Sequence, residues 1–526
     1  MAKSKILLFL AFCFFILLQV LFSFGLAPLS DDLTHYLDVT RLRNGDISVY
    51  DVYKDLFNDP NRYTRPFSPI LLGTFIVLSQ FSENMFFLWG ILGAASCYLV
   101  YRTTLKLFNN RSLAILAFLL VMLFPLSSSN LFSPVMQTGH YIIFSFTITT
   151  LLIQSPLFQK KTTCIFLLIL NTTTHLFYEM NLFLTPLLLL LIWKNTEKKY
   201  FNALIVVVLP IVIAFSYKLF FAKLIYPNYF DYSSSKITLG FDRIKEVWIA
   251  LIKLFTTDTL YIVIKSFEMI SLYSIWDFIL MFLGIGIALL TAIFIKPNNL
   301  VSKTHIGVLI SFFLMTIFIF FISNYPPIAF SFENRILLWV RISSSLLLAV
   351  FINNALFWYQ SYKLLNAGLR LGIFTIIFSG AICLISQKNS WIFASEYNKN
   401  LVRNLEKAFP INQEQIKVLY VLDKEKKDRL ITDEAVLSAD YEISAAIKLY
   451  TNANFNPRNI AIFNPINYSL YQIGNIKLNK RPKTKFKLDK KGIKLRKNIL
   501  EYPFYIFDER DNSVSKIENQ NQFKIK

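Results

Sequence analysis

The sequence predicts a polytopic α-helical membrane protein with about eleven transmembrane helices and a small C-terminal α/β extracytoplasmic domain. Of its 526 residues 55% are hydrophobic, and the mean hydropathy is +0.48, more apolar side chain than a soluble protein of this length buries. Apolar runs close to the ~20 residues that cross a bilayer core recur as far as Gln387. From Lys388 the chain turns polar and charged. We therefore expect a transmembrane domain over residues 1–387 and a soluble domain over 388–526.

The formal net charge of +21 is spread over short loops between the apolar runs and over the C-terminal part. Lys and Arg in short loops set the orientation of a membrane protein, so this excess does not indicate a nucleic-acid partner. Cys13, Cys97, Cys164 and Cys383 all lie in apolar runs, and none belongs to a C-x-x-C pair. The cysteines therefore predict neither a disulfide framework nor a zinc site.

The first apolar run, Ile6–Leu26, follows Lys3 and Lys5 and predicts an uncleaved helix whose N-terminus is cytoplasmic. The run is longer than the core of a usual signal peptide. Its best small-residue cleavage site, Gly25-Leu26-Ala27, is followed at once by Pro28.

The basic loops predict the path of the chain after this helix. Phe67–Gln80 is short for a span and is interpreted as a helix that lies at the outer surface or dips into the membrane. If it spanned, the later basic loops would lie on the wrong side. A long outer loop is expected to run to about Tyr273. The spans after the first are expected at Asn84–Tyr101, Leu113–Leu126, Tyr141–Leu157, Ile165–Phe177, Leu182–Trp193, Ala203–Phe221, Ile275–Ile295, Ile306–Ile322, Leu337–Trp358 and Leu371–Ser386.

This path brings three sets of polar residues to the outer face of the membrane. They come from the first outer loop, from the end of the fifth span and from the segment before the tenth: Asp31, Asp32, His35, Asp38, Tyr63, Arg65, His175, Tyr178, Glu179, Glu333, Asn334 and Arg335. The expected bilayer midplane has almost no ionisable residue, which is unlike the ion or substrate pathway of a coupled transporter.

Carboxylates and arginines at one membrane surface suit transfer of a group from a lipid-linked phosphate to an acceptor hydroxyl. A carboxylate can act as general base toward the hydroxyl. An arginine is the natural partner of a phosphate, because its planar fork donates two parallel hydrogen bonds.

The same layout resembles the GT-C superfamily of membrane glycosyltransferases. The resemblance rests on the acidic Ser30-Asp31-Asp32 directly after the first helix, on Arg65-Pro66 closing the first outer loop, and on the run Leu99–Phe108 leading toward Phe124-Pro125. It covers the first ~130 residues in detail and the rest in layout, including the outer C-terminal domain. In size and layout the chain is most similar to the O-antigen serotype-converting glucosyltransferases of phages and enteric bacteria.

The resemblance implies a sugar donor carried on polyprenyl phosphate, a glycan or lipid acceptor such as O-antigen, and a bacterial inner-membrane location. It implies that Asp31 or Asp32 is the catalytic base and that Arg65 and Arg335 bind the donor phosphate. Glu179 and Glu333 would line the sugar or acceptor site, and Tyr63, His175 and Tyr178 are further expected substrate-binding residues. No cofactor is predicted. Because Ser127–Gly139 has no acid where some branches bind a metal, the need for a divalent metal stays open.

Plainer interpretations of the same residues remain open. Ser30 with Asp31 and Asp32 also makes a good helix start, with a capping serine and two acids near the helix dipole. Arg65 can reach the lipid headgroups as an anchor. Glu179 lies at a helix boundary, and Arg335 can pair with Glu333 as a structural contact.

In the C-terminal part, Gln415–Leu422 and Asn459–Phe463 are expected as strands and Asp433–Tyr450 as a helix. The basic run Lys477–Lys497 is interpreted as a solvated hairpin or as a contact with anionic headgroups. Two alternative functions are a polymerase or ligase of lipid-linked oligosaccharides, which would centre on outer arginines, and a flippase or transporter, which would show broken helices at mid-membrane.

Overall fold

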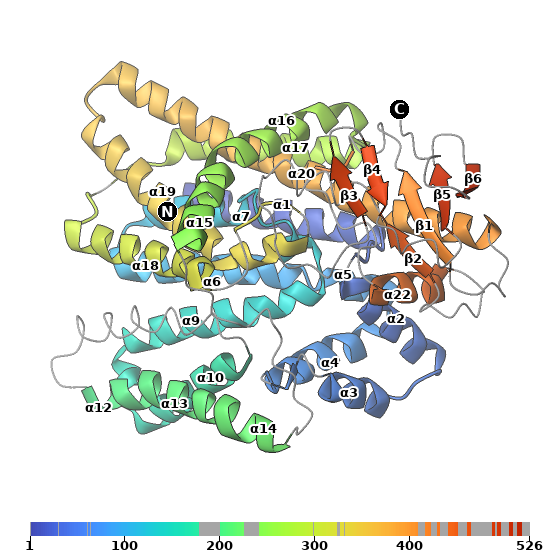
Figure 1. Cartoon of the computed structure of the whole chain (residues 1–526). Helices are drawn as coiled ribbons and strands as arrows, with labels where there is room; N and C mark the ends of the chain where they lie inside the picture. The colour runs from blue at the N-terminus through green and yellow to red at the C-terminus, as the bar shows by residue number, and fades with distance from the viewer. Residues whose placement is uncertain are drawn as a thin grey trace.

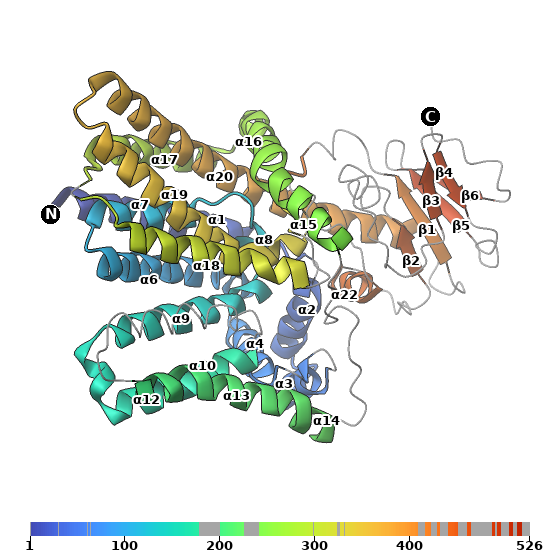
Figure 2. The same ribbon diagram turned by 60° about the vertical axis from the view of Figure 1, so that its left-hand side comes forward.

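The computed structural model describes residues 2–29, 31–59, 62–63, 65–177, 200–225, 241–297, 299–322, 327–330, 332–408, 416–421, 429–431, 440–450, 460–463, 486–489, 492–495, 504–508 and 513–517. Most of these residues are helical, and the strands come late in the chain (Figure 1). The N-terminus and the strands lie at opposite ends of a bundle of long helices, most of which run along one axis (Figure 2).

The bundle consists of helices that coincide with the apolar runs. They are α1 (Ala2–Phe24), α6 (Ile91–Phe108), α7 (Arg111–Met122), α9 (His140–Ile153), α10 (Lys161–Phe177), α13 (Leu209–Ser216), α17 (Ile275–Phe294), α18 (Lys303–Ile322), α19 (Leu338–Trp358) and α20 (Lys363–Ala408). In the segment 200–225, α13 is preceded by α12 (Tyr200–Ala203) and the π-helical η5 (Leu204–Val208). It is followed by the π-helical η6 (Tyr217–Phe221) and by α14 (Ala222–Ile225).

Among the described residues, 7 helices are long and apolar enough to cross a membrane. They are Lys5–Phe24, Glu83–Phe108, Asp242–Leu272, Ile275–Phe294, Lys303–Phe321, Asn334–Trp358 and Lys363–Asn404. Three shorter apolar helices, Phe67–Ser79, Arg111–Met122 and Leu204–Ser216, fall below that length. The chain is thus a helical protein with several potential membrane spans, while the predicted span Leu182–Trp193 lies outside the described residues.

The long outer loop expected before Tyr273 is wrong for residues 241–272. They form one continuous helix built from α15 (Phe241–Lys253), the π-helical η8 (Leu254–Asp258), α16 (Thr259–Glu268) and the 3-10 turn η9 (Met269–Leu272). Charged residues recur along it, so no uninterrupted apolar run marks it in the sequence, although one face is apolar. In Figure 2 this helix lies obliquely to the other long helices.

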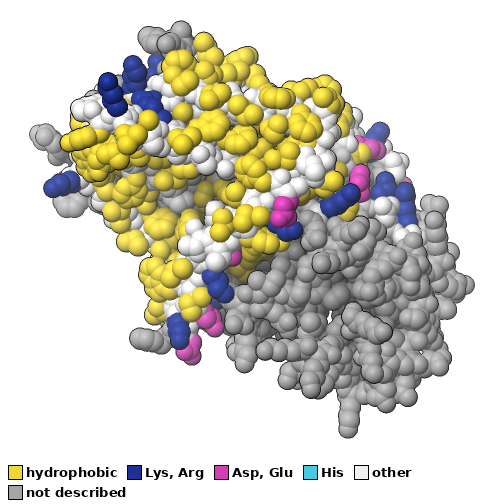
Figure 3. All heavy atoms as spheres, turned by 90° about the horizontal axis from the view of Figure 1, so that it is seen from above, with side chains coloured by type: hydrophobic (Ala, Val, Ile, Leu, Met, Phe, Trp, Pro, Cys, Tyr) yellow, Lys and Arg dark blue, Asp and Glu magenta, His cyan; other side chains and the backbone are white. Residues whose placement is uncertain are grey.

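Helix α7 has only 12 residues, about 18 Å, which is less than a bilayer core. Every residue from Leu113 to Met122 is nevertheless buried, because α6 and α19 pack along it. Such a helix is apolar all round because it contacts protein rather than lipid. The face of the bundle drawn in Figure 3 shows a broad band of hydrophobic side chains, with Lys and Arg mainly around its margins.

The segments predicted to face the cytoplasm meet at one end of the bundle. There the Asn110 side-chain amide donates to the side-chain oxygens of Asn299 (2.9 Å) and Asn353 (3.1 Å). The Val301 amide donates to the Asn354 side chain at 3.0 Å. The loops before α7 and α18 therefore meet the last turns of α19 at one end of the bundle.

The segment predicted as the first outer loop, the predicted surface helix and the start of the predicted span Asn84–Tyr101 fold into short helices at the opposite end. They are α2 (Asp31–Asn44), α3 (Val49–Asn58), α4 (Phe67–Ser79) and α5 (Glu83–Leu88). Ser48 and Asp51 form a capping box that starts α3. Helix α4 packs on α2, α3 and α5. With 13 residues it is shorter than a full span, as α7 is too, and its placement at the membrane surface stays a prediction.

The C-terminal part contains a sheet in the order β2-β1-β5-β6, formed by β1 (Ile416–Val421), β2 (Ile460–Phe463), β5 (Phe504–Asp508) and β6 (Ser513–Ile517). β1 is parallel to β2 and β5, whereas β5 and β6 are antiparallel. The expected strands therefore form. In the basic run, β3 (Phe486–Asp489) and β4 (Gly492–Leu495) pair as an antiparallel ribbon.

Of the expected helix Asp433–Tyr450, residues Asp440–Tyr450 form α22, and residues 433–439 lie outside the described part of the chain. It packs against both α2 and α20. Helix α20 runs without interruption across the predicted domain boundary between Gln387 and Lys388. The division of the chain at 387 stays a prediction.

Gly380 of α20 lies against the end of α7. A Cβ atom at this position would come within 2.8 Å of the Leu123 carbonyl oxygen, which is backbone and cannot move aside. We expect Gly380→Ala to lower the free energy of unfolding by about 1–3 kcal/mol. Thermal unfolding in detergent, followed with a thiol-reactive dye that reports on the buried cysteines, measures the change.

Gly372→Ala is the matched control, because Gly372 lies on the same helix and a Cβ atom added there would meet open space. It should leave the melting temperature unchanged or raise it slightly. An equal loss of stability in both variants would contradict the role assigned to Gly380.

Candidate functional site

The site begins where the chain leaves α1 and enters α2. The connection between α1, which ends at Phe24, and α2, which begins at Asp31, contains Leu26 with a positive φ of 42° and, two residues later, Pro28. The Asp32 amide donates to the Leu29 carbonyl at 3.0 Å, and Asp31 and Asp32 occupy the first turn of α2. Two carboxylates in a first helical turn are favoured by the helix dipole. Ser30, the predicted cap, lies outside the described residues.

Asp31 forms an ion pair with Arg335, which comes from the 3-10 turn η10 (Phe332–Leu337) just before α19. Nη1 of Arg335 donates to Oδ2 of Asp31 at 3.0 Å. The two side chains are 30% and 25% exposed, so the pair is accessible from solvent without being fully solvated. Residues 304 positions apart in sequence thus meet at the end of the bundle opposite the N-terminus.

A set of buried amide contacts holds Arg335 in place. Oδ1 of Asn334 accepts from the Ser129 amide at 3.0 Å, and its Nδ2 donates to Oγ of Ser128 at 2.9 Å. Nδ2 of Asn130 donates to the Arg335 carbonyl at 2.9 Å. These bonds join η10 to α8 (Ser129–Phe132), so the backbone that carries the guanidinium is fixed before any ligand binds.

Asp32 is in a different environment from its neighbour. Its side chain is completely buried, and Oδ1 accepts from Oγ of Ser133 at 2.8 Å and from the Val135 amide at 3.0 Å. Oδ2 is also buried and has no hydrogen-bond partner among the described residues. Asp32 therefore holds the segment after α8 against α2, whereas the carboxylate of Asp31 is accessible from solvent.

Burial raises the pKa of Asp32 well above its usual value, although the hydrogen bonds from Val135 and Ser133 oppose the rise. A carboxyl whose pKa is higher in the folded state loses stabilising effect as the pH increases through the interval between its unfolded and folded pKa values. The interval starts near the ordinary value of 3.8. Above the pKa of the folded state, Asp32 is ionised in the folded protein, and the buried charge lowers the stability of the fold.

Replacing Asp32 with Asn, which cannot ionise, should remove this dependence. We expect the melting temperature of Asp32→Asn, relative to the unmodified protein, to rise as the pH increases from about 4. Thermal unfolding in detergent at a series of pH values tests this. A constant difference at all pH values would show that Asp32 does not carry a raised pKa. Asp46→Asn, an exposed change in the loop after α2, is the control.

A second polar cluster lies further along α2. Nη2 of Arg62 is 3.4 Å from Nε2 of His35, and Nε of Arg62 donates to Oδ2 of Asp59 at 3.0 Å. Nδ1 of His35 lies 3.8 Å from Oδ2 of Asp38. The sequence placed His35 and Asp38 among the outer polar residues but assigned no site role to them or to Arg62. The signal for the first two was their spacing, because residues 31, 35 and 38 share one face of a helix.

The other predicted site residues are placed as follows. The Arg65 amide donates to the Arg62 carbonyl at 2.8 Å, and the Tyr63 hydroxyl donates to the Asn58 carbonyl at 3.1 Å. His175 is buried in the last turn of α10, a helix that packs on α9, α13 and α4. Tyr178 and Glu179 lie outside the described residues, and Glu333 is placed in η10 without a described side chain.

Arg341 is a further residue that sequence reasoning missed. It lies in α19, is 1% exposed, and its Nε donates to the Val121 carbonyl at 2.6 Å. Its Nη2 lies 3.8 Å from Sγ of Cys97. This buried charged side chain therefore links α19 to α6 and α7. Sequence analysis overlooked it because it is a single charged residue in an otherwise apolar run.

Within the described part of the chain, no three His, Cys, Asp or Glu side chains come close enough to hold a metal ion. The paired Asp31 and Arg335 can do two things chemically. A carboxylate can take a proton from a hydroxyl, and a guanidinium can exchange that carboxylate for a phosphate of the same charge sign. Comparison with protein-family models and with curated proteins gives no match to this chain.

Proposed function

We propose that this protein is a GT-C-like glycosyltransferase that moves a sugar from a polyprenyl-phosphate carrier to a cell-surface glycan or lipid at the outer face of a bacterial inner membrane. The observation that carries the proposal is the pair between Asp31 and Arg335. It unites the acidic motif after the first helix with the arginine before α19, at the bundle end predicted to face outward. The proposed topology has eleven spans, a cytoplasmic N-terminus and an extracytoplasmic C-terminal α/β domain.

In the proposed reaction, Asp31 takes the proton of the acceptor hydroxyl as its oxygen attacks the anomeric carbon. The bond between that carbon and the phosphate oxygen breaks, and polyprenyl phosphate leaves with the electron pair. The phosphate needs no acid to leave, and Arg335 neutralises its charge. A single displacement of this kind inverts the configuration of the sugar carbon.

The ion pair also supplies a reason for ordered binding. While Arg335 contacts Asp31, the carboxylate is held as an acceptor of the guanidinium hydrogen bond. A donor phosphate that takes over the guanidinium releases Asp31 toward the acceptor hydroxyl. Asp32, being buried, orients the backbone at Val135 and takes no proton from substrate in this scheme.

The first test is the mass profile of the host's surface glycans with and without the gene. The proposal predicts a fixed mass gain per acceptor unit, equal to one sugar residue. Asp46→Asn, at an exposed position close to α2, should retain the gain. No gain in any strain, with the protein present in the membrane, would argue against transfer and would turn attention to the transporter alternative.

Arg335→Gln tests the phosphate contact separately. Because a hydrogen bond to a charged group contributes about 1.5–3 kcal/mol, we expect the KM for the polyprenyl-phosphate donor to rise about ten- to a hundredfold. The KM for the acceptor should change far less. Equal effects on both substrates would mean that Arg335 holds the site together rather than binding the donor.

A further inference from the structure

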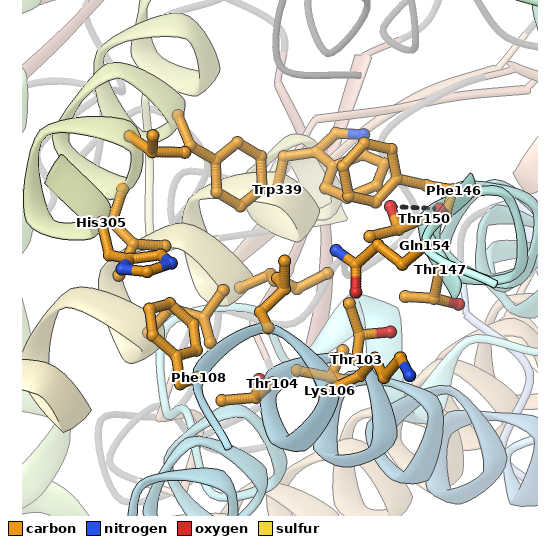
Figure 4. Close-up of a pocket in the computed structure, with 17 residues that line it drawn as sticks. Thr103, Thr104, Lys106, Phe108, Phe146, Thr147, Thr150, Gln154, His305 and Trp339 are labelled. Carbon is orange, nitrogen blue, oxygen red and sulfur yellow. Dashed lines mark hydrogen bonds between the residues drawn. The ribbon is translucent and has the colours of Figure 1, made fainter. Parts of the chain in front are cut away.

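A cavity lies between α6, α9, α18 and α19, away from the Asp31–Arg335 pair. It has a volume of about 530 Å³, within the range of ligand sites. Apolar side chains including Phe146, Leu309, Phe312 and Ile342 make up most of its lining. Figure 4 shows Phe108 and His305 on one side of this cavity and Gln154 and Thr103 on the other.

The cavity adjoins a smaller basic one. A hollow of about 360 Å³ is lined by Arg102, Leu105, Lys106, Asn109 and Leu151, and Lys106 lines both cavities. Arg102 and Lys106 are exposed at the end of α6. This is the bundle end where Asn110, Asn299 and Asn353 meet, opposite the Asp31–Arg335 pair. An apolar chamber with two cations at its mouth is complementary to a lipid with an anionic headgroup.

Between the chamber and the cations there is an unsatisfied donor. The Gln154 residue lines the cavity, and its Nε2 is buried and has no hydrogen-bond partner among the described residues. Oγ1 of Thr103, on the facing helix α6, is buried without a partner as well. Buried polar groups normally find partners, so a ligand with an acceptor oxygen just below its headgroup would satisfy them.

We propose that this cavity binds one anionic glycerophospholipid, with an acyl chain in the chamber, an ester carbonyl at Gln154 and the phosphate at Lys106 and Arg102. The ester carbonyl distinguishes this occupant from a polyprenyl phosphate, which has none. The position also separates it from the sugar donor, whose phosphate belongs at Arg335. The binding is independent of the proposed transfer reaction.

The test uses the full chain, purified in detergent and stripped of lipid, with native mass spectrometry to count bound lipids. One copy of dipalmitoyl phosphatidylglycerol should bind tightly. Its affinity should exceed that of phosphatidylcholine, of ether-linked phosphatidylglycerol and of undecaprenyl phosphate. Tighter binding of undecaprenyl phosphate would overturn the proposal, because the occupant of the cavity would then be a carrier lipid and not a phospholipid. Equal binding of phosphatidylglycerol and phosphatidylcholine would remove the role of the cations.

Variants locate the site. Lys106→Gln should weaken phosphatidylglycerol about fivefold, the contribution of one cation near a lipid surface. Lys363→Gln, an exposed lysine at the same bundle end, should have no effect. Gln154→Leu should abolish the preference for ester over ether lipid, and retention of that preference would overturn the assignment of Gln154.

Filling the chamber gives an independent readout. Leu309 is 5% exposed and lines the cavity, so Leu309→Trp should remove the tightly bound copy. Leu314 lies on the same helix but is 50% exposed, and Leu314→Trp should keep it. Should Leu309→Trp fail to fold, Lys106→Gln still decides the question, because that side chain is at the surface. Loss of the bound copy in both tryptophan variants would place the lipid elsewhere.

Discussion

The variant Asp31→Asn is expected to lower kcat about 10²- to 10⁴-fold, the contribution usual for a general base. The amide keeps the shape of the carboxylate but cannot take the proton of the acceptor hydroxyl. Because Asp31 is 30% exposed, the change should leave the fold intact. Initial rates of sugar transfer from a synthetic polyprenyl-phosphate donor, measured with both substrates saturating, give the number.

Asp32→Asn is the informative comparison, since the two carboxylates are neighbours in sequence and differ in burial. If Asp31 is the base, Asp32→Asn should cost much less in kcat, and Asp46→Asn should cost nothing. The reverse order, with Asp32 the more damaging position, would exchange the two roles. Full activity after loss of both carboxylates would eliminate a carboxylate base altogether.

The change Lys388→Met is expected to lower the free energy of unfolding by about 3–5 kcal/mol. Nζ of Lys388 lies 2.5 Å from Oδ1 of Asp277, and the two side chains are only 5% and 3% exposed. Nδ2 of Asn389 also donates to Asp277, at 3.1 Å. Removing the ammonium leaves a buried carboxylate without its counter-charge, which is costly in a low-dielectric environment.

Two controls separate this effect from the loss of a lysine as such. Lys363→Met changes an exposed lysine at the start of the same helix and should leave the melting temperature unchanged. The double variant Asp277→Asn/Lys388→Met should recover most of the lost stability, because it removes both charges together while the Asn oxygen can still accept from Ser274 at the start of α17. A double variant as unstable as Lys388→Met would mean that the pair is not the source of the effect.

Long apolar runs were the most predictable part of the fold. Ile275–Ile295 and Leu337–Trp358 match α17 and α19 to within a residue, because a long and predominantly apolar run is expected to cross a bilayer as a helix. The helix at 241–272 was missed for the complementary reason. Its apolar residues are spaced by charges such as Asp242 and Lys245, so its apolar face exists only after the helix forms.

The candidate site was predictable in its members but not in its pairing. Asp31, Asp32 and Arg335 were each singled out by type and by predicted side of the membrane. Nothing in the local sequence says that Asp32 is buried and Asp31 is not, because burial is decided by Ser133 and Val135, about a hundred residues away. Likewise, the contact of Arg335 with Asp31 depends on the docking of η10 against α8.

Helix α20 has a mechanical consequence. At 1.5 Å per residue its 46 residues extend about 70 Å, more than twice the thickness of a hydrocarbon core. One stiff rod therefore joins the predicted cytoplasmic end to the C-terminal elements. Helix α22 packs on this rod and on α2, the helix that carries Asp31. A force applied to α22 would therefore act on α20, which is continuous over its whole length. The same force would act on the first turn of α2, which carries Asp31.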